Sequence, residues 1–159
     1  MEPDPPHPLP PAAPPLSAGC LLQGWSDQQR LLERQHERLD RRLEDLIAAH
    51  GESDRPPAAE NTHAQRLACR RLLQLVRLHF GLEERWLRSR GVLLPSHRSA
   101  HREVMVVALT DLNRAESDRR NRLEVLETLQ SWLTTHNLGP DAAAYALATR
   151  IQAAAGPGP

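Results

Sequence analysis

Apolar residues recur at spacings of three and four along most of the chain from Trp25 onward. Residues at this spacing share one face of an α-helix, so the pattern predicts amphipathic helices. Turn and loop residues divide the pattern into four helices. They are expected over about 25–51 and 61–90, from 95 or 96 onward, and from 117 or 118 onward. Asn137 to Pro140 is predicted to break the last of these, and a short helix over 141–152 is predicted to follow.

The chain contains no convincing strand and no glycine-rich phosphate loop. Four amphipathic helices with short connections predict an all-α fold, an up-down-up-down antiparallel four-helix bundle with a short C-terminal helical extension. Residues 1–19 are dense in proline and alanine, which predicts a disordered tail. The expected organisation is therefore a tail over 1–19, a bundle over 20–152 and a flexible C-terminal tail over 153–159.

Charge and composition narrow the classes of function. The 20 basic and 20 acidic residues give a formal net charge of zero, which argues against nucleic acid or an acidic membrane as the main partner. No apolar run reaches the about 18 residues of a transmembrane helix, and the N-terminus lacks the features of a signal peptide. Cys20 and Cys69 are too few for a disulfide framework. A cytoplasmic protein is therefore expected.

Every predicted helix carries histidine within its own apolar stripe. Two helices carry pairs four residues apart, which share a helix face, and a buried carboxylate is costly unless it is paired or bound to a metal. Imidazoles and carboxylates that converge in one core therefore indicate a metal centre. The candidate ligands are His36, His79, Glu83, His97, His101, His136 and Asp141.

The number of candidate ligands favours some metals over others. Five imidazoles and two carboxylates are too many for one tetrahedral zinc ion and suit two five- or six-coordinate ions, iron among others. A ferritin-like centre is a weaker alternative; Glu33–His36 and Glu60–His63 fit its Glu-x-x-His motif. The segment HRSAH lacks the glutamate of HExxH, which excludes a zinc peptidase of that type.

Two other residues are of a type that can bind a metal but are not candidates. Glu84 follows Glu83, but it points about 100° away on a helix and is expected on the surface. His50 fits the first apolar stripe, but it lies at a helix C-terminus, where the helix dipole favours a cation. We expect neither residue to bind the metal.

Together these segments resemble the hemerythrin family in its bacterial single-domain form, over about residues 25–150. RQHERLDRRLEDL resembles the family's first-helix QHxxL segment, and HFGLEE its HFxxEE segment. PSHRSAH resembles its HxxxH segment, and SWLTTHNLGPDAAAYA its WLxxHIxxxD segment. Each pair alone is weak evidence, but all seven residues occur in order, with one constellation on each helix.

The resemblance implies a non-haem di-iron site with an oxo or hydroxo bridge. By analogy with the family, His97, His101 and His136 would hold one iron and His36 and His79 the other. Glu83 and Asp141 would bridge the two. The iron with fewer protein ligands would bind dioxygen, with Leu133 and Asn137 near the pocket.

Asn137 departs from the family pattern, which has an apolar residue after the last-helix histidine. A polar group there favours entry of water and a shorter-lived oxygenated form. We expect an oxygen-binding protein for storage, delivery or sensing rather than an enzyme. The alternative is a redox enzyme or scavenger acting on oxygen, peroxide or nitric oxide, and either use needs a separate reductase or signalling partner.

Overall fold

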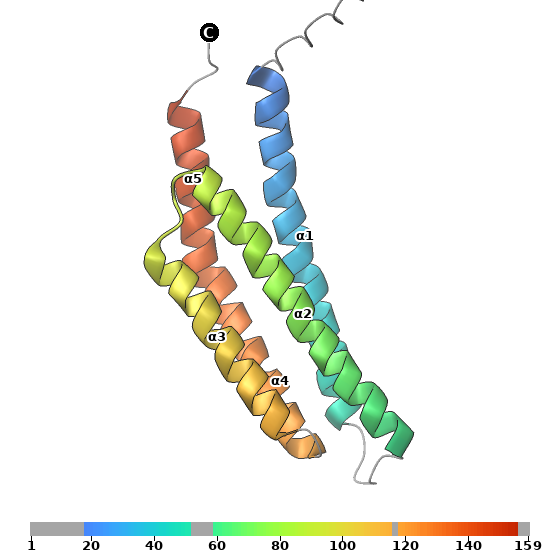
Figure 1. The fold of residues 1–159 in the computed structure, drawn as a ribbon. Coiled ribbons are helices and arrows are strands. Elements are labelled where there is room, and N and C mark those ends of the chain that lie inside the picture. Colours follow the sequence, from blue (N-terminus) through green and yellow to red (C-terminus); the bar gives the residue numbers. More distant parts are fainter. Residues whose placement is uncertain (1–17, 52–58, 116–117, 156–159) are drawn as a thin grey trace, which may run out of the picture.

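The computed structural model describes residues 18–51, 59–115 and 118–155, and within these ranges all regular structure is helical. The helices are α1 (Ala18–Gly51), α2 (Ala59–Ser89), α3 (Pro95–Arg114), α4 (Arg119–His136), a π-helical turn η1 (Asn137–Asp141), and α5 (Ala142–Ala154). Helices α1 to α4 run alternately up and down side by side, and α5 continues α4 at the end where α1 begins (Figure 1). The prediction of an all-α antiparallel four-helix bundle is confirmed.

The predicted domain limits stay predictions. Residues 1–17 of the expected N-terminal tail and 156–159 of the C-terminal tail lie outside the described residues. Ala18 and Gly19, which the sequence assigned to the tail, already belong to α1. None of the described helices is both long enough and apolar enough to cross a membrane.

Local sequence determines where α2 ends and where α4 begins. Gly91 adopts a left-handed φ of 69°, a conformation that glycine reaches without a Cβ penalty. Its N–H donates to the Arg88 carbonyl at 3.0 Å, and Val92 N–H donates to Leu87 at 3.0 Å, which is the Schellman pattern that closes a helix. Asp118 caps α4, because its Oδ1 accepts the N–H groups of Arg120 and Asn121 at 2.9 and 3.2 Å.

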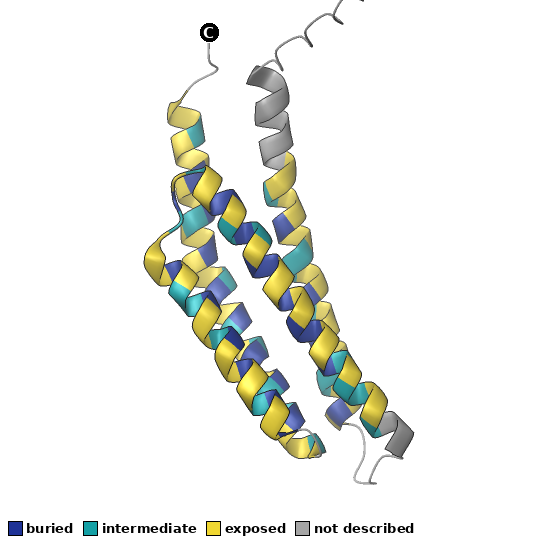
Figure 2. Cartoon of the chain, in the orientation of Figure 1, coloured by how far each residue is buried: buried dark blue, intermediate teal, exposed yellow. Residues whose placement is uncertain are grey.

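The core lies along the inner stripes of α1 to α4 (Figure 2). Neighbouring apolar residues differ in burial: Val76 is buried while Leu75 is 43% exposed. Met105 and Leu133 are buried as well, while Val104 and Trp132 are half-buried. A buried side chain of this size contributes about 1.5–3 kcal/mol by leaving water, so these choices fix how the helices face one another.

The predicted helix break at Asn137–Pro140 is wrong. The backbone stays helical through this segment but widens into η1, where the N–H of Ala142 donates to the carbonyl of Asn137, five residues back. Pro140 has no N–H to donate and normally disrupts an α-helix. A π turn adds one residue to the helical register, and the rod accommodates Pro140 there without ending.

A buried cluster of polar side chains connects α1, α2 and α4. Arg122 is 0% exposed. Its Nε donates to His50 Nε2 at 3.4 Å, and its other nitrogens donate to Gln65 Oε1 at 3.4 Å and the Ala115 carbonyl at 3.5 Å. The free thiol of Cys69 lies 3.9 Å from His50 Nε2. His50 is therefore a buried hydrogen-bonding residue whose pKa is lowered by burial, and it lies outside both candidate ligand groups.

We expect Arg122→Ala to lower the free energy of unfolding by about 2–3 kcal/mol, because it leaves buried partners of the guanidinium without hydrogen bonds. Chemical denaturation measures this difference. Arg120→Ala is the matched control, since its side chain is 85% exposed and pairs only with Glu124 in the described contacts. Equal stabilities of the two variants would show that the buried cluster contributes little.

Candidate metal centre

The seven candidate ligands come from five elements and meet in the middle of the bundle. They form two groups whose ligand atoms lie within 4.8 Å of one another. One group consists of His97, His101, His136 and Asp141, and the other of His36, His79 and Glu83. All except His36, which is half-buried, are buried.

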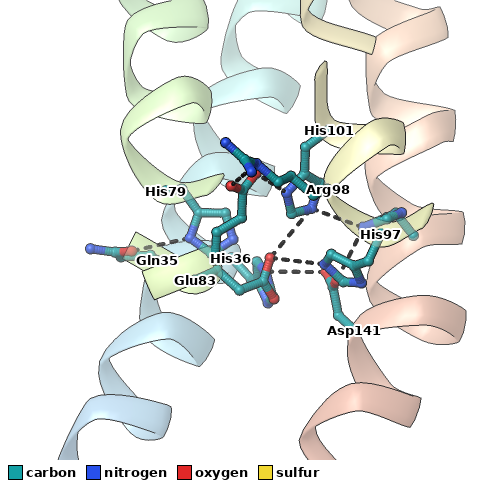
Figure 3. Close-up of polar contacts among 10 residues, drawn as sticks. Gln35, His36, His79, Glu83, His97, Arg98, His101 and Asp141 are labelled. Carbon is teal, nitrogen blue, oxygen red and sulfur yellow. Dashed lines mark hydrogen bonds and ion pairs between the residues drawn. The ribbon is translucent and has the colours of Figure 1, made fainter. Parts of the chain in front are cut away.

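Helix geometry brings the paired residues to the site. His79 and Glu83 on α2, and His97 and His101 on α3, are each four residues apart and therefore share a face. Figure 3 shows these side chains pointing toward one another from adjacent helices. The sequence prediction for both pairs agrees with this geometry.

His136 and Asp141 come together for a different structural reason. Residues five apart on a regular α-helix point about 140° away from each other. In η1 the hydrogen bonds join residues five apart, so such residues lie above one another. As a result His136 Nε2 lies 3.1 Å from Asp141 Oδ1. The π turn is what brings this carboxylate into the site.

Imidazole nitrogens and carboxylate oxygens are close throughout the site. Glu83 Oε2 lies 3.6 Å from His97 Nε2 and 3.4 Å from His101 Nε2. Asp141 approaches His97 Nε2 at 3.3 Å and, through its other oxygen, His36 Nε2 at 3.6 Å. Each carboxylate thus reaches both groups or lies between them, the position that a bridging ligand takes.

Six of these inward-facing atoms are buried without a hydrogen bond. They are Nε2 of His36, His79 and His97, both carboxylate oxygens of Glu83, and Oδ1 of Asp141. Buried polar atoms are nearly always hydrogen-bonded, and a buried carboxylate without a partner costs several kcal/mol. Atoms with free lone pairs that converge on one small volume fit a bound cation, and a set of five imidazoles and two carboxylates fits iron.

Electrostatics keep key imidazoles in the metal-binding form. Burial lowers the pKa of His79 to about 4 and that of His101 to about 3, so both rings are neutral at pH 7. Burial also acts to lower the pKa of His97, but the adjacent carboxylate of Glu83, together with Asp141, raises it overall. Metal binding needs neutral imidazole, and the two most strongly shifted rings already provide it.

Two outer residues orient the imidazoles, and the sequence analysis missed both as functional. The side-chain oxygen of Gln35 accepts from His79 Nδ1 at 3.1 Å, and Glu84 Oε1 accepts from His101 Nδ1 at 3.2 Å. Because these oxygens only accept, Nδ1 carries the proton and Nε2 presents its lone pair to the site. The expectation that Glu84 lies on the open surface is wrong, because α3 covers that flank of α2. A histidine that binds a metal through one nitrogen needs a hydrogen-bond acceptor for the other. This requirement could have pointed to Gln35 and Glu84 in the sequence.

We expect Glu84→Ala to weaken iron binding about tenfold or more, because it removes the acceptor that fixes the His101 ring. Competition with a chelator of known affinity measures the change. Glu127→Ala, which removes an exposed glutamate of α4, is the control and should bind iron like the parent chain. A Glu84 variant that also retained the parent affinity would contradict this role.

Aromatic rings surround the site. Phe80 stacks on His101 with ring centroids 3.9 Å apart, and Trp132 stacks on His136 at 4.3 Å. Tyr145 lies parallel to His36 at 6.3 Å, and its buried hydroxyl has no hydrogen-bond partner. Burial, together with the neighbouring carboxylates, raises the pKa of this hydroxyl. These rings hold the histidines in place and cover part of the site.

An open cavity of about 780 Å³ reaches the site beside α5. Its lining includes His36 and Asp141, together with Asn137, Glu33 and Arg150. Asn137, expected near an oxygen pocket, thus lines the one side on which a candidate ligand is partly exposed. Leu133 is absent from this lining and packs in the core, so its part in an oxygen pocket stays a prediction.

The ferritin-like alternative finds no support in the geometry. His63, the histidine of its second motif, is exposed. Glu33 is also exposed and lines the cavity rather than joining a candidate ligand group. The carboxylate-rich set that such a centre needs is therefore not assembled among the described residues.

Fold and site together define a helical bundle that binds metal cations through a buried histidine and carboxylate cluster. The family model of the hemerythrin HHE cation-binding domain matches residues 27–148. The chain belongs to this family. No curated protein and no solved structure matches it.

Proposed function

We propose that the two ligand groups hold two iron ions and that the pair binds dioxygen for storage, delivery or sensing. His97, His101 and His136 would hold one iron, and His36 and His79 would hold the other. Glu83 and Asp141 would serve as ligands to both ions, together with an oxo or hydroxo group. An iron pair of this kind supplies two electrons to dioxygen and takes them back on its release.

The observation that carries this proposal is the inequality of the two groups. One has three histidines, all buried, and the other has two, of which His36 is partly exposed. The cavity beside Asn137 opens on His36. The side with fewer protein ligands is therefore the side that a small molecule reaches from outside.

The surrounding residues support binding more than turnover. Phe80 and Trp132 stack on His101 and His136 of the fuller group and hold these rings in place. Gln35 and Glu84 fix the ring orientations. The chain's own part is to hold the ligands rigidly and to keep most of them out of contact with water.

An optical spectrum tests the proposal. The iron-loaded, reduced protein is measured before air is admitted, after air is admitted, and after oxygen is removed again. A visible charge-transfer band that appears with oxygen and disappears on its removal supports reversible binding. A chain that binds no iron contradicts the proposal at its first step.

A second function, as a redox enzyme or scavenger of oxygen, peroxide or nitric oxide, is favoured by one observation. The cavity at His36 is lined by polar groups, among them Glu33, Asn137 and Arg150. Such a lining admits water and small polar oxidants as easily as oxygen. Direct and irreversible passage to the diferric spectrum, with no oxygen-dependent intermediate band, would favour this function.

We expect Asn137→Ile to slow autoxidation of the oxygenated form several-fold, because an apolar side chain reduces water in the cavity. Decay of the visible band after oxygenation measures the rate. Thr149→Val, on the outer lining of the same cavity, is the control and should have a smaller effect. An unchanged decay in the Asn137 variant would remove this residue from control of the site.

A further inference from the structure

A groove between α1 and α2 lies on the flank of the bundle away from the cavity at α5. It has a volume of about 430 Å³. Its lining residues are Gln35, Arg38, Leu39, Arg41, Arg42, Asp45, Leu75, Leu78 and His79. We call this set the α1–α2 groove.

The α1–α2 groove ends at the metal centre. His79 lines it and is a candidate iron ligand. Gln35, whose oxygen lies 3.1 Å from His79 Nδ1, lines it as well. In Figure 3 these two side chains meet at the edge of the site farthest from His97. A molecule seated in the groove is therefore separated from the iron pair by a single imidazole and its hydrogen-bond partner.

The α1–α2 groove is basic although the chain as a whole is neutral. Its lining holds three arginines against one aspartate, and one of the three, Arg41, is paired with Glu37 at 3.8 Å. Successive residues of an α-helix are rotated by about 100° around its axis. In central α1 the arginines therefore fall within an arc of about 100° around the axis. The acidic residues, except Asp45, fall within a separate arc of about 60°. The first set is Arg34, Arg38, Arg41 and Arg42, and the second is Glu33, Glu37, Asp40 and Glu44. The helix thus divides its charge, and three of these exposed arginines line the groove beside α2.

The groove also offers apolar surface. Leu75 is 43% exposed and Leu78 is 58% exposed, and both line it. Exposed apolar residues gathered inside a charged rim are typical of protein interaction sites. A small patch of this kind suits a weak, transient contact, the type of interface that electron-transfer partners form.

We propose that the α1–α2 groove docks an acidic iron–sulfur protein that donates single electrons to the metal centre. The arginines attract the acidic surface, the two leucines seat its apolar centre, and His79 lies at the contact. Each donor gives up one electron, so two successive dockings reduce the pair from diferric to diferrous. The proposal depends on the iron pair proposed above and adds its route of reduction.

Binding and reduction are both measured, with an acidic plant-type [2Fe–2S] ferredoxin as the probe. The affinity of the oxidised probe for the diferric protein is measured by calorimetry at low and high salt, where no electron passes. The rate of reduction by the reduced probe is measured by stopped flow. The groove variant is Arg38→Gln with Arg42→Gln. The matched control, Arg102→Gln with Arg120→Gln, removes the same charge from exposed positions on α3 and α4.

We expect the parent chain to bind the probe at low salt and to lose affinity at high salt, because the attraction is between charges. The groove variant should bind about tenfold more weakly and be reduced about tenfold more slowly at low salt. The control pair should change either quantity by about twofold or less. Dithionite, a small reductant that needs no docking surface, should reduce all three proteins at similar rates.

The outcomes separate the two proposals. No diferric spectrum in the parent chain overturns the proposed function, and the docking proposal with it. A normal diferric spectrum with no binding of the probe at low salt overturns the docking proposal alone. Equal weakening in the groove variant and the control also overturns it, because attraction by overall charge would then explain the binding.

Discussion

Glu83→Gln is expected to remove about one iron or more per chain without unfolding the protein. Glu83 is 0% exposed, and its Oε2 lies within 3.6 Å of two histidines from α3. An amide of the same size has no negative charge and is a poor bridge between two cations. Iron content after reconstitution and desalting measures the loss.

The same substitution also tests whether the buried cluster exists for the metal. Both oxygens of Glu83 lack hydrogen bonds, so without metal the carboxylate is a buried charge that destabilises the fold. The metal-free Glu83→Gln protein should therefore unfold at the same temperature as the metal-free parent or higher. A clear drop in the unfolding temperature of the metal-free variant, with iron content unchanged, would mean that Glu83 serves the fold rather than a metal.

Loading with iron is expected to raise the unfolding temperature by about 10 °C. A ligand present at about 1,000 times its dissociation constant stabilises the folded state by about 4 kcal/mol. For a chain of 159 residues each kcal/mol corresponds to about 2–4 °C. Thermal unfolding followed by circular dichroism, with and without iron under reducing anaerobic conditions, measures the shift.

The physical reason is that the metal-free core carries several polar atoms that no protein group satisfies. These atoms include Nε2 of His36 and His79 and Oδ1 of Asp141. Magnesium, which prefers oxygen ligands and keeps its waters, is the control ion and should give little stabilisation. The Glu83→Gln variant should gain less from iron than the parent chain. Identical unfolding temperatures for the iron-loaded and metal-free parent would refute a metal centre at this place.

Much of the site was predictable because two of its pairs obey the helix period. His79 with Glu83 and His97 with His101 are four residues apart, and any regular helix places such pairs on one face. The apolar stripes that surround them show that this face points inward. Residues such as Leu43 and Leu72, both 0% exposed, follow directly from that pattern.

Other parts of the site escaped prediction because they depend on neighbouring helices. The angular position of Glu84 on α2 suggests exposure to solvent. Its contact with His101 exists only because α3 packs against that side of α2. Gln35 acts through a histidine 44 positions away in the sequence. Arg122 lies in a segment rich in charged residues, whose composition suggests exposure to solvent. It is nevertheless fully buried, because its hydrogen-bond partners come from other parts of the bundle.

The sequence by itself determined the helices, their inward faces, and the two pairs His79 with Glu83 and His97 with His101, since these follow from local periodicity. The tertiary structure decided what local periodicity does not contain. It replaced the expected break at Pro140 by a π turn that rotates Asp141 onto the face of His136. It also chose the acceptors that orient the ligand imidazoles, because a hydrogen bond between helices depends on how whole helices pack rather than on the residues of either one alone.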